Sequence, residues 1–115
     1  MSRATNAPAS RERRRRLAKA KGFYGARSKL FRTATEAVDR AMRLSTIHRK
    51  LKKRDFRQLW IARINAATRT EGISYSKFIA GLAKAGVALN RKMLSEIAIH
   101  DPEGFKTIVE IAKNA

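Results

Sequence analysis

Apolar residues recur at helical spacing through the second half of the chain. One face of a predicted helix carries apolar side chains at positions i, i+3, i+4, i+8 and i+11, namely Phe56, Leu59, Trp60, Ile64 and Ala67. We expect this face, including Trp60, to pack into a core rather than to bind a partner. No strand pattern or internal repeat competes with this interpretation, so the sequence predicts an all-α fold.

Three shorter helices are predicted after Gly72, a residue that can end the preceding helix with a positive φ. They span 75–85, 91–100 and 102–113, and the residues that can cap them are Ser74, Asn90 and Asp101. The side chains expected to point inward are Phe78, Ile79, Leu82, Met93, Leu94, Ile97, Phe105, Ile108, Val109 and Ala112.

The first half of the chain has a weaker apolar pattern. A helix is expected from its cap at Ser10 to Lys21, followed by a bend where Gly22 and Gly25 bracket two aromatic residues. From about Ser28 a long helix is predicted to run to Gly72, with an alternative restart at a capping box over 33–36. The narrow apolar stripe of this helix consists of Leu30, Ala34, Ala37, Val38, Ala41 and Met42. On its outer face, Glu36 with Arg40 and Asp39 with Arg43 are expected to form i,i+4 ion pairs.

Charge divides the chain in the same place as the apolar pattern. Of the total formal charge of +18, residues 1–55 hold 18 Lys+Arg against 4 acids, whereas residues 56–115 hold 9 against 5. Large apolar side chains occupy 11 of the first 55 positions and 20 of the last 60. We therefore predict a basic extension over 1–55, ordered by its partner, and a small globular helical domain over 56–115.

The composition excludes several classes of function. Cysteine is absent, which excludes disulfides and thiolate metal sites, and no apolar run is long enough to span a bilayer. His48 and His100 lack partners at metal-ligand spacing, and Ser95, His100 and Asp101 lack the context of a catalytic triad. We expect no enzyme activity, cofactor, metal, small-molecule substrate or membrane partner.

A polyanion is the partner that this charge favours. Arg13–Arg16 point in all directions around a helix, and a second basic run covers 49–57. RNA is favoured over DNA because no short recognition helix is evident, with a DNA-compacting architectural protein as the alternative. Phe23 and Tyr24 have few apolar neighbours in their own segment of the sequence and are better candidates for base stacking than for a core. Tyr75 and Phe78 lie near a helix start that could contact a ligand.

Four strings resemble the bacterial large-subunit ribosomal protein number twenty family. They are KGFYGARSKLFR over 21–32, RDFRQLWIARINAA over 54–67, GISYSKFI over 72–79 and LNRKMLSEIA over 89–98. The resemblance covers nearly the whole chain in order. It implies a cytoplasmic ribosomal protein of a bacterium, rather than of an organelle, that binds large-subunit ribosomal RNA early in assembly and lies beside other ribosomal proteins. Some members of this family also repress their own messenger RNA.

The resemblance also implies which residues bind RNA. In the extension these are Arg11, Arg13, Arg14, Arg15, Arg16, Lys19, Lys21, Arg27, Lys29, Arg32, Arg49, Lys50, Lys52, Lys53 and Arg54. In the domain they are Arg57, Arg63, Asn65, Arg69, Ser74, Tyr75 and Lys77. The sequence departs from the family pattern in the few basic residues before Ser10 and in Thr46-Ile47-His48, so the resemblance implies no RNA contacts for those two segments.

Overall fold

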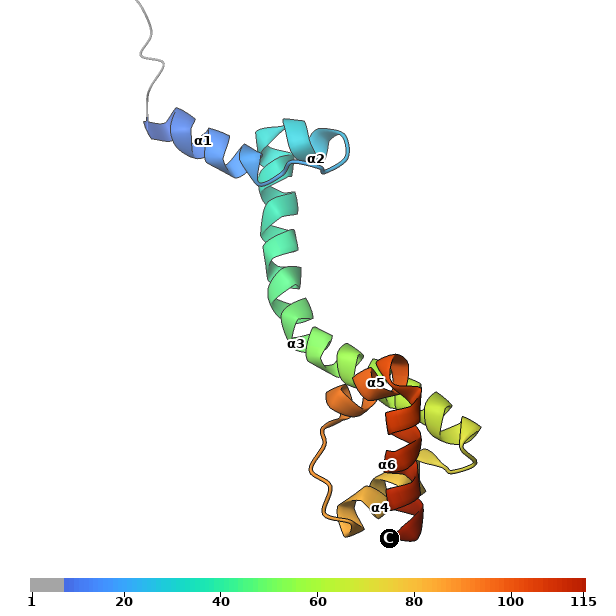
Figure 1. Cartoon of the computed structure of the whole chain (residues 1–115). Helices are drawn as coiled ribbons and strands as arrows, with labels where there is room; N and C mark the ends of the chain where they lie inside the picture. Colours follow the sequence, from blue (N-terminus) through green and yellow to red (C-terminus); the bar gives the residue numbers. More distant parts are fainter. Residues whose placement is uncertain (1–7) are drawn as a thin grey trace, which may run out of the picture. The chain divides into compact units, whose positions relative to one another are not determined.

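The computed structural model describes residues 8–115, and this part of the chain is helical without strands. The helices are α1 (Pro8–Ala18), α2 (Ala26–Lys29), α3 (Phe31–Thr70), α4 (Tyr75–Lys84), α5 (Arg91–His100) and α6 (Pro102–Asn114) (Figure 1). The predicted all-α class and the long helix are confirmed. The beginning of the predicted extension, before Pro8, lies outside the described residues.

Two compact units divide between Lys50 and Leu51, with α3 contributing residues to both. The first unit holds α1, α2 and the beginning of α3. Its core is small: Ala20, Ala34 and Val38 are buried, and Leu17 and Phe23 pack against them. Gly22 and Gly25 have φ angles of 88° and 59°, which confirms the predicted bend between α1 and α2.

Several local predictions for the first unit are wrong. Helix α1 begins at Pro8, so Ser10 lies inside it, because proline has the φ of a first helical residue and needs no N–H partner there. The helix ends at Ala18 instead of Lys21, since the turn bonds of the next residues replace helical ones. A separate short helix, α2, precedes α3, and the long helix begins at Phe31.

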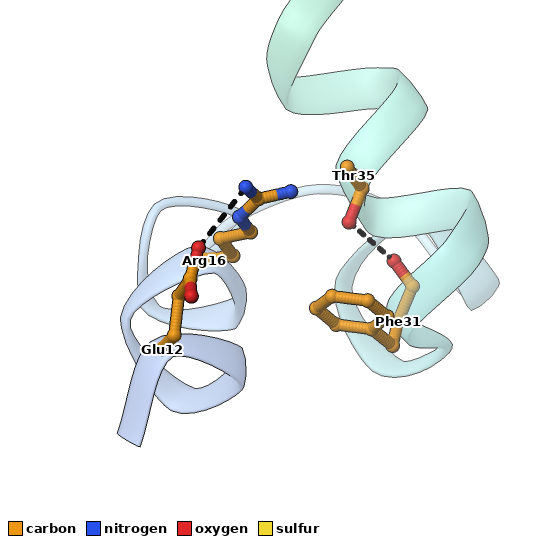
Figure 2. A network of polar contacts seen from close by, with 4 residues as sticks. All are labelled: Glu12, Arg16, Phe31 and Thr35. Carbon is orange, nitrogen blue, oxygen red and sulfur yellow. Dashed lines mark hydrogen bonds and ion pairs between the residues drawn. The ribbon is translucent and has the colours of Figure 1, made fainter. Parts of the chain in front are cut away.

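The proposed capping box also does not form. Thr33 lies inside α3, and the neighbouring Thr35 hydroxyl donates to the Phe31 carbonyl oxygen at 2.8 Å, within the helix (Figure 2). The predicted pairs of Glu36 with Arg40 and Asp39 with Arg43 are not within 4.0 Å of each other in the described chain. Of the predicted stripe, Ala34 and Val38 are buried, whereas Leu30 and Met42 are 60% and 48% exposed.

The second unit has the larger core. Its buried members are Ile64, Phe78, Leu82, Leu94, Phe105, Val109 and Ala112. Helix α6 packs against both α4 and α5, and the rings of Phe78 and Phe105 lie 5.6 Å apart. Gly81 is buried where α4 meets α6, and a Cβ atom there would collide with the Ala112 backbone. The close approach of these two helices therefore requires glycine.

The helix boundaries of this unit follow the predicted signals closely. The Asn90 side chain accepts from the Met93 N–H and the Asp101 side chain from the Gly104 N–H, both at 2.9 Å, so both predicted caps are confirmed. Ser74 precedes α4 as expected, but its side chain makes no capping bond. Gly72 has a φ of 73° and ends α3, and Lys113 Nζ donates to the Glu71 carbonyl oxygen at 2.6 Å beside it.

Four residues predicted to point into the core of this unit lie outside it. Phe56 and Leu59 are 44% and 40% exposed, and Trp60 is partly buried but lies outside the core. On α3 only the face at Ile64 and Ala67 reaches the core, because the packed helices do not cover the one or two turns before it. Met93 is 48% exposed, whereas its neighbour Leu94 is buried.

Candidate nucleic-acid interface

The predicted arginine cluster lies on α1. Arg11 and Arg13–Arg16 are all exposed, because this helix buries no residue of its own. Arg16 forms an ion pair with Glu12 at 3.1 Å, seen in Figure 2, and the Arg13 guanidinium lies 5.3 Å from the centre of the Phe31 ring. The remaining cations of the cluster have no acidic partner within 4.0 Å in the described chain, so they are available to phosphate.

The two aromatic residues of the bend have different environments. Phe23 is partly buried against Ala20, Ala34 and Val38, so it packs with the small core, although its own sequence segment holds few apolar residues. It anchors the small core of the first unit. Tyr24 is 94% exposed and its ring faces solvent, which leaves it free to stack on a base.

The other predicted cations of the first unit are exposed on its turn and helices. They are Lys19, Lys21, Arg27, Lys29, Arg32, Arg49 and Lys50. Arg49 alone among them has its guanidinium held by hydrogen bonds, donating to the Ser45 hydroxyl at 2.7 Å and to the Thr46 hydroxyl at 3.3 Å. Both partners are neutral, so the full positive charge of Arg49 remains for a ligand.

On α3 the second unit carries a further basic group. Lys52, Lys53, Arg54, Arg57, Arg63 and Arg69 are exposed there. The ammonium of Lys52 lies 5.8 Å from the centre of the Phe56 ring, which gives this exposed aromatic residue a cationic neighbour. Arg57, Arg63 and Arg69 are spaced six residues apart, or about 240° around a helix, so they do not share one face.

The starts of α4 and α5 come together in the second unit. Arg91 Nε donates a hydrogen bond to the Tyr75 hydroxyl at 2.8 Å, joining the first residue of each helix. Ser74 and Lys77 are exposed beside Tyr75, and neither helix has an acid in its first turn. Two positive helix ends with nearby cations and hydroxyls suit an anionic ligand such as phosphate.

Arg91 is a candidate that the sequence prediction missed. It lies 16 residues from Tyr75 and no local pattern links the two positions. Asn65, which is predicted to bind RNA, is half-buried on α3, and its backbone carbonyl oxygen accepts a hydrogen bond from the Thr68 hydroxyl at 3.1 Å. RNA contact by the residues of both units remains a prediction, and the structure adds Arg91 to the set that can make it.

Other chemistries find little support in the described part of the chain. Among residues 8–115, no group of three or more His, Cys, Asp or Glu side chains could hold a metal ion. No helix in the same residues has the length and apolar character of a membrane span. Exposed cations are the dominant chemical feature.

The comparison with known families identifies the family of this chain. The family model described as "Ribosomal protein L20" matches residues 3–108, which cover both units. The chain belongs to the ribosomal protein L20 family. The match confirms the resemblance seen in the four sequence strings and identifies a structural protein, not an enzyme.

Individual members of the L20 family are similar along nearly their full length. The large ribosomal subunit protein bL20 of Clostridium botulinum (strain Hall) is 58% identical over 114 residues, covering 98% of this chain and 96% of its own. The bL20 protein of Clostridium acetobutylicum is 59% identical over the same coverage. The exposed cations therefore belong to a fold whose relatives are named as large-subunit proteins.

Proposed function

We propose that this L20-family protein is a structural component of the large subunit of a bacterial ribosome, where it binds ribosomal RNA directly and supports early assembly. The proposal rests on the exposed Lys and Arg side chains along residues 11–57, most of which have no acidic partner in the described chain. Residues 1–55 of the chain hold 18 Lys+Arg and 4 acids. Such a surface can bind phosphate groups without first breaking many ion pairs within the protein.

The two units have different tasks in this proposal. The cations of the first unit neutralise phosphates where RNA helices crowd together, which lowers their mutual repulsion. The second unit has a formal net charge of only +6 over 51–115, from 12 Lys+Arg against 6 acids, and it recognises one RNA region through placed groups such as Tyr75, Lys77 and Arg91. Neighbouring ribosomal proteins are the further partners that a place in the subunit implies.

Salt dependence of binding tests the electrostatic part of the proposal. If about seven phosphates are neutralised, a plot of log affinity for large-subunit ribosomal RNA against log salt concentration has a slope of about −5 to −6. A slope near zero would contradict the proposal. Duplex DNA of matched length is the competitor that distinguishes the architectural alternative, because a DNA-compacting protein would bind both nucleic acids equally well.

We also propose that the same RNA-binding surface recognises the protein's own messenger and lowers its translation, as the family resemblance implies. Support comes from the second unit, whose basic and hydroxyl groups at the α4 and α5 starts could bind any RNA that copies the ribosomal site. Filter binding with the protein's own leader transcript tests this idea. The proposal requires that ribosomal RNA displaces the leader competitively.

A further inference from the structure

A groove of about 470 Å³ lies in the first unit, between the bend after α1 and the middle of α3. Phe23, Val38, Ala41 and Met42 form its apolar part, and Lys19 and Arg49 are its cations. None of the described residues that line it is acidic. A groove whose floor is apolar and whose charged residues are all cations is complementary to an anionic ligand that has a flat apolar part.

The Arg49 side chain is already held in this groove. Its two terminal nitrogens donate to the hydroxyls of Ser45 and Thr46 at 2.7 and 3.3 Å, and both of these residues also line the groove. A guanidinium whose position is already fixed by hydrogen bonds loses less conformational entropy on binding an anion than a mobile one does. Arg49 is therefore preorganised to bind an anion. The neutral hydroxyls leave its charge uncompensated.

We propose that this groove binds one unpaired nucleotide of RNA, with the base on the apolar floor and the adjoining phosphates at Lys19 and Arg49. A base inside a duplex has its faces covered by its neighbours, so only an extruded or single-stranded base offers a free face to Phe23 and Met42. The high ratio of cations to acids throughout residues 1–55 favours a phosphate polymer over an acidic peptide. The inference rests on the proposed function, since it assumes that the first unit meets RNA.

Two oligonucleotides of equal charge test the inference with the full chain. One is a short single-stranded oligoadenylate, and the other is the same oligomer with abasic sites in place of its bases. The groove requires that the oligoadenylate binds about fivefold or more tightly, which is the scale of stacking for one base. Salt dependence should be the same for both, because their phosphates are equal in number.

Variants that alter the floor separate the groove from other stacking sites such as Tyr24. Ala41→Leu, which fills the groove from an exposed position, and Met42→Ala, which removes part of the floor, should each reduce the preference for bases. The matched control is Ala18→Leu, an exposed alanine of α1 that does not line the groove and should retain the preference. Circular dichroism confirms that each variant keeps its helix content.

The outcomes distinguish this inference from the proposed function. If neither oligomer binds at low salt while large-subunit ribosomal RNA does, the groove proposal is overturned and the proposed function stands; if ribosomal RNA also fails to bind, the proposed function is overturned. If both bind with equal affinity, or if the two floor variants behave like Ala18→Leu, the groove proposal is overturned while RNA binding stands. Displacement of oligoadenylate by an acidic, aromatic-rich peptide at lower concentration than by free oligoadenylate would also overturn it in favour of a protein ligand.

Discussion

The Nε atom of Arg91 donates to the Tyr75 hydroxyl at 2.8 Å and thereby ties the start of α5 to the start of α4. Both residues are partly buried, and Tyr75 also packs against the core of the second unit. The bond fixes a cation beside the exposed Ser74 and Lys77. It therefore links the packing of this unit to the surface that we expect to bind RNA.

Removing the Tyr75 hydroxyl tests this link. Tyr75→Phe should lower the free energy of unfolding by about 1 kcal/mol, because Arg91 loses a partly buried partner. Urea unfolding followed by circular dichroism measures this change, and RNA affinity should fall with it. The control is Tyr24→Phe, whose hydroxyl lies on a side chain that is 94% exposed and should leave the unfolding free energy unchanged. Equal effects of the two substitutions would argue against a role for the bond.

The contact between α4 and α6 should tolerate no side chain at Gly81. Gly81→Ala places a methyl group against the Ala112 backbone, and the resulting displacement of the helices should cost about 2 kcal/mol or more of unfolding free energy. Ser76→Ala on the exposed face of the same helix should change stability by less than about 0.5 kcal/mol. A Gly81→Ala variant as stable as Ser76→Ala would show that the two helices separate easily.

Two buried hydroxyls of the second unit should respond in opposite directions. Ser95 Oγ is buried without a hydrogen-bond partner in the described chain, so Ser95→Ala should stabilise the protein by about 1 kcal/mol. Thr68 is equally buried, but its hydroxyl donates to the Asn65 carbonyl oxygen at 3.1 Å. Thr68→Val should therefore destabilise by about 1 kcal/mol, and thermal unfolding of both variants reveals the two signs.

Phe23 and Tyr24 should separate folding from RNA binding in the first unit. Phe23→Ala removes an anchor of the small core and should reduce the helix content measured by circular dichroism. Tyr24→Ala should retain the helix content but bind ribosomal RNA more weakly, because the exposed ring is lost as a stacking surface. A loss of helix content in Tyr24→Ala would contradict the division of roles.

Amide hydrogen exchange should reveal unequal stability along the free chain. The first unit buries three small or medium apolar residues, whereas the second buries seven, including two phenylalanines. We therefore predict fast exchange over residues 1–55 and slow exchange in the core helices of 56–115, which fold on their own. Added ribosomal RNA should slow exchange in the first segment. Strong protection throughout the free extension would contradict the prediction.

Helix positions in the second unit could be predicted well because their signals are local. Asn90 and Asp101 are caps whose side chains bond to the backbone three residues on, and Gly72 adopts a conformation that few other residues allow. Family membership could likewise be predicted from four strings, and the family model confirms it. In the first unit two nearby residues could each begin the first helix, and Pro8 rather than Ser10 does so.

By itself, the amino-acid sequence determined the helical class, the division of charge and the family, because each depends on composition or on neighbours within a few residues. Only the tertiary structure decided which apolar residues are buried. Phe56 and Ile64 belong to the same helical face, yet Phe56 is 44% exposed and Ile64 is fully buried. Burial depends on what another part of the chain places over a side chain, and helical spacing carries no information about that. For the same reason the hydrogen bond between Arg91 and Tyr75 could not be predicted from the sequence, since the two residues lie on different helices.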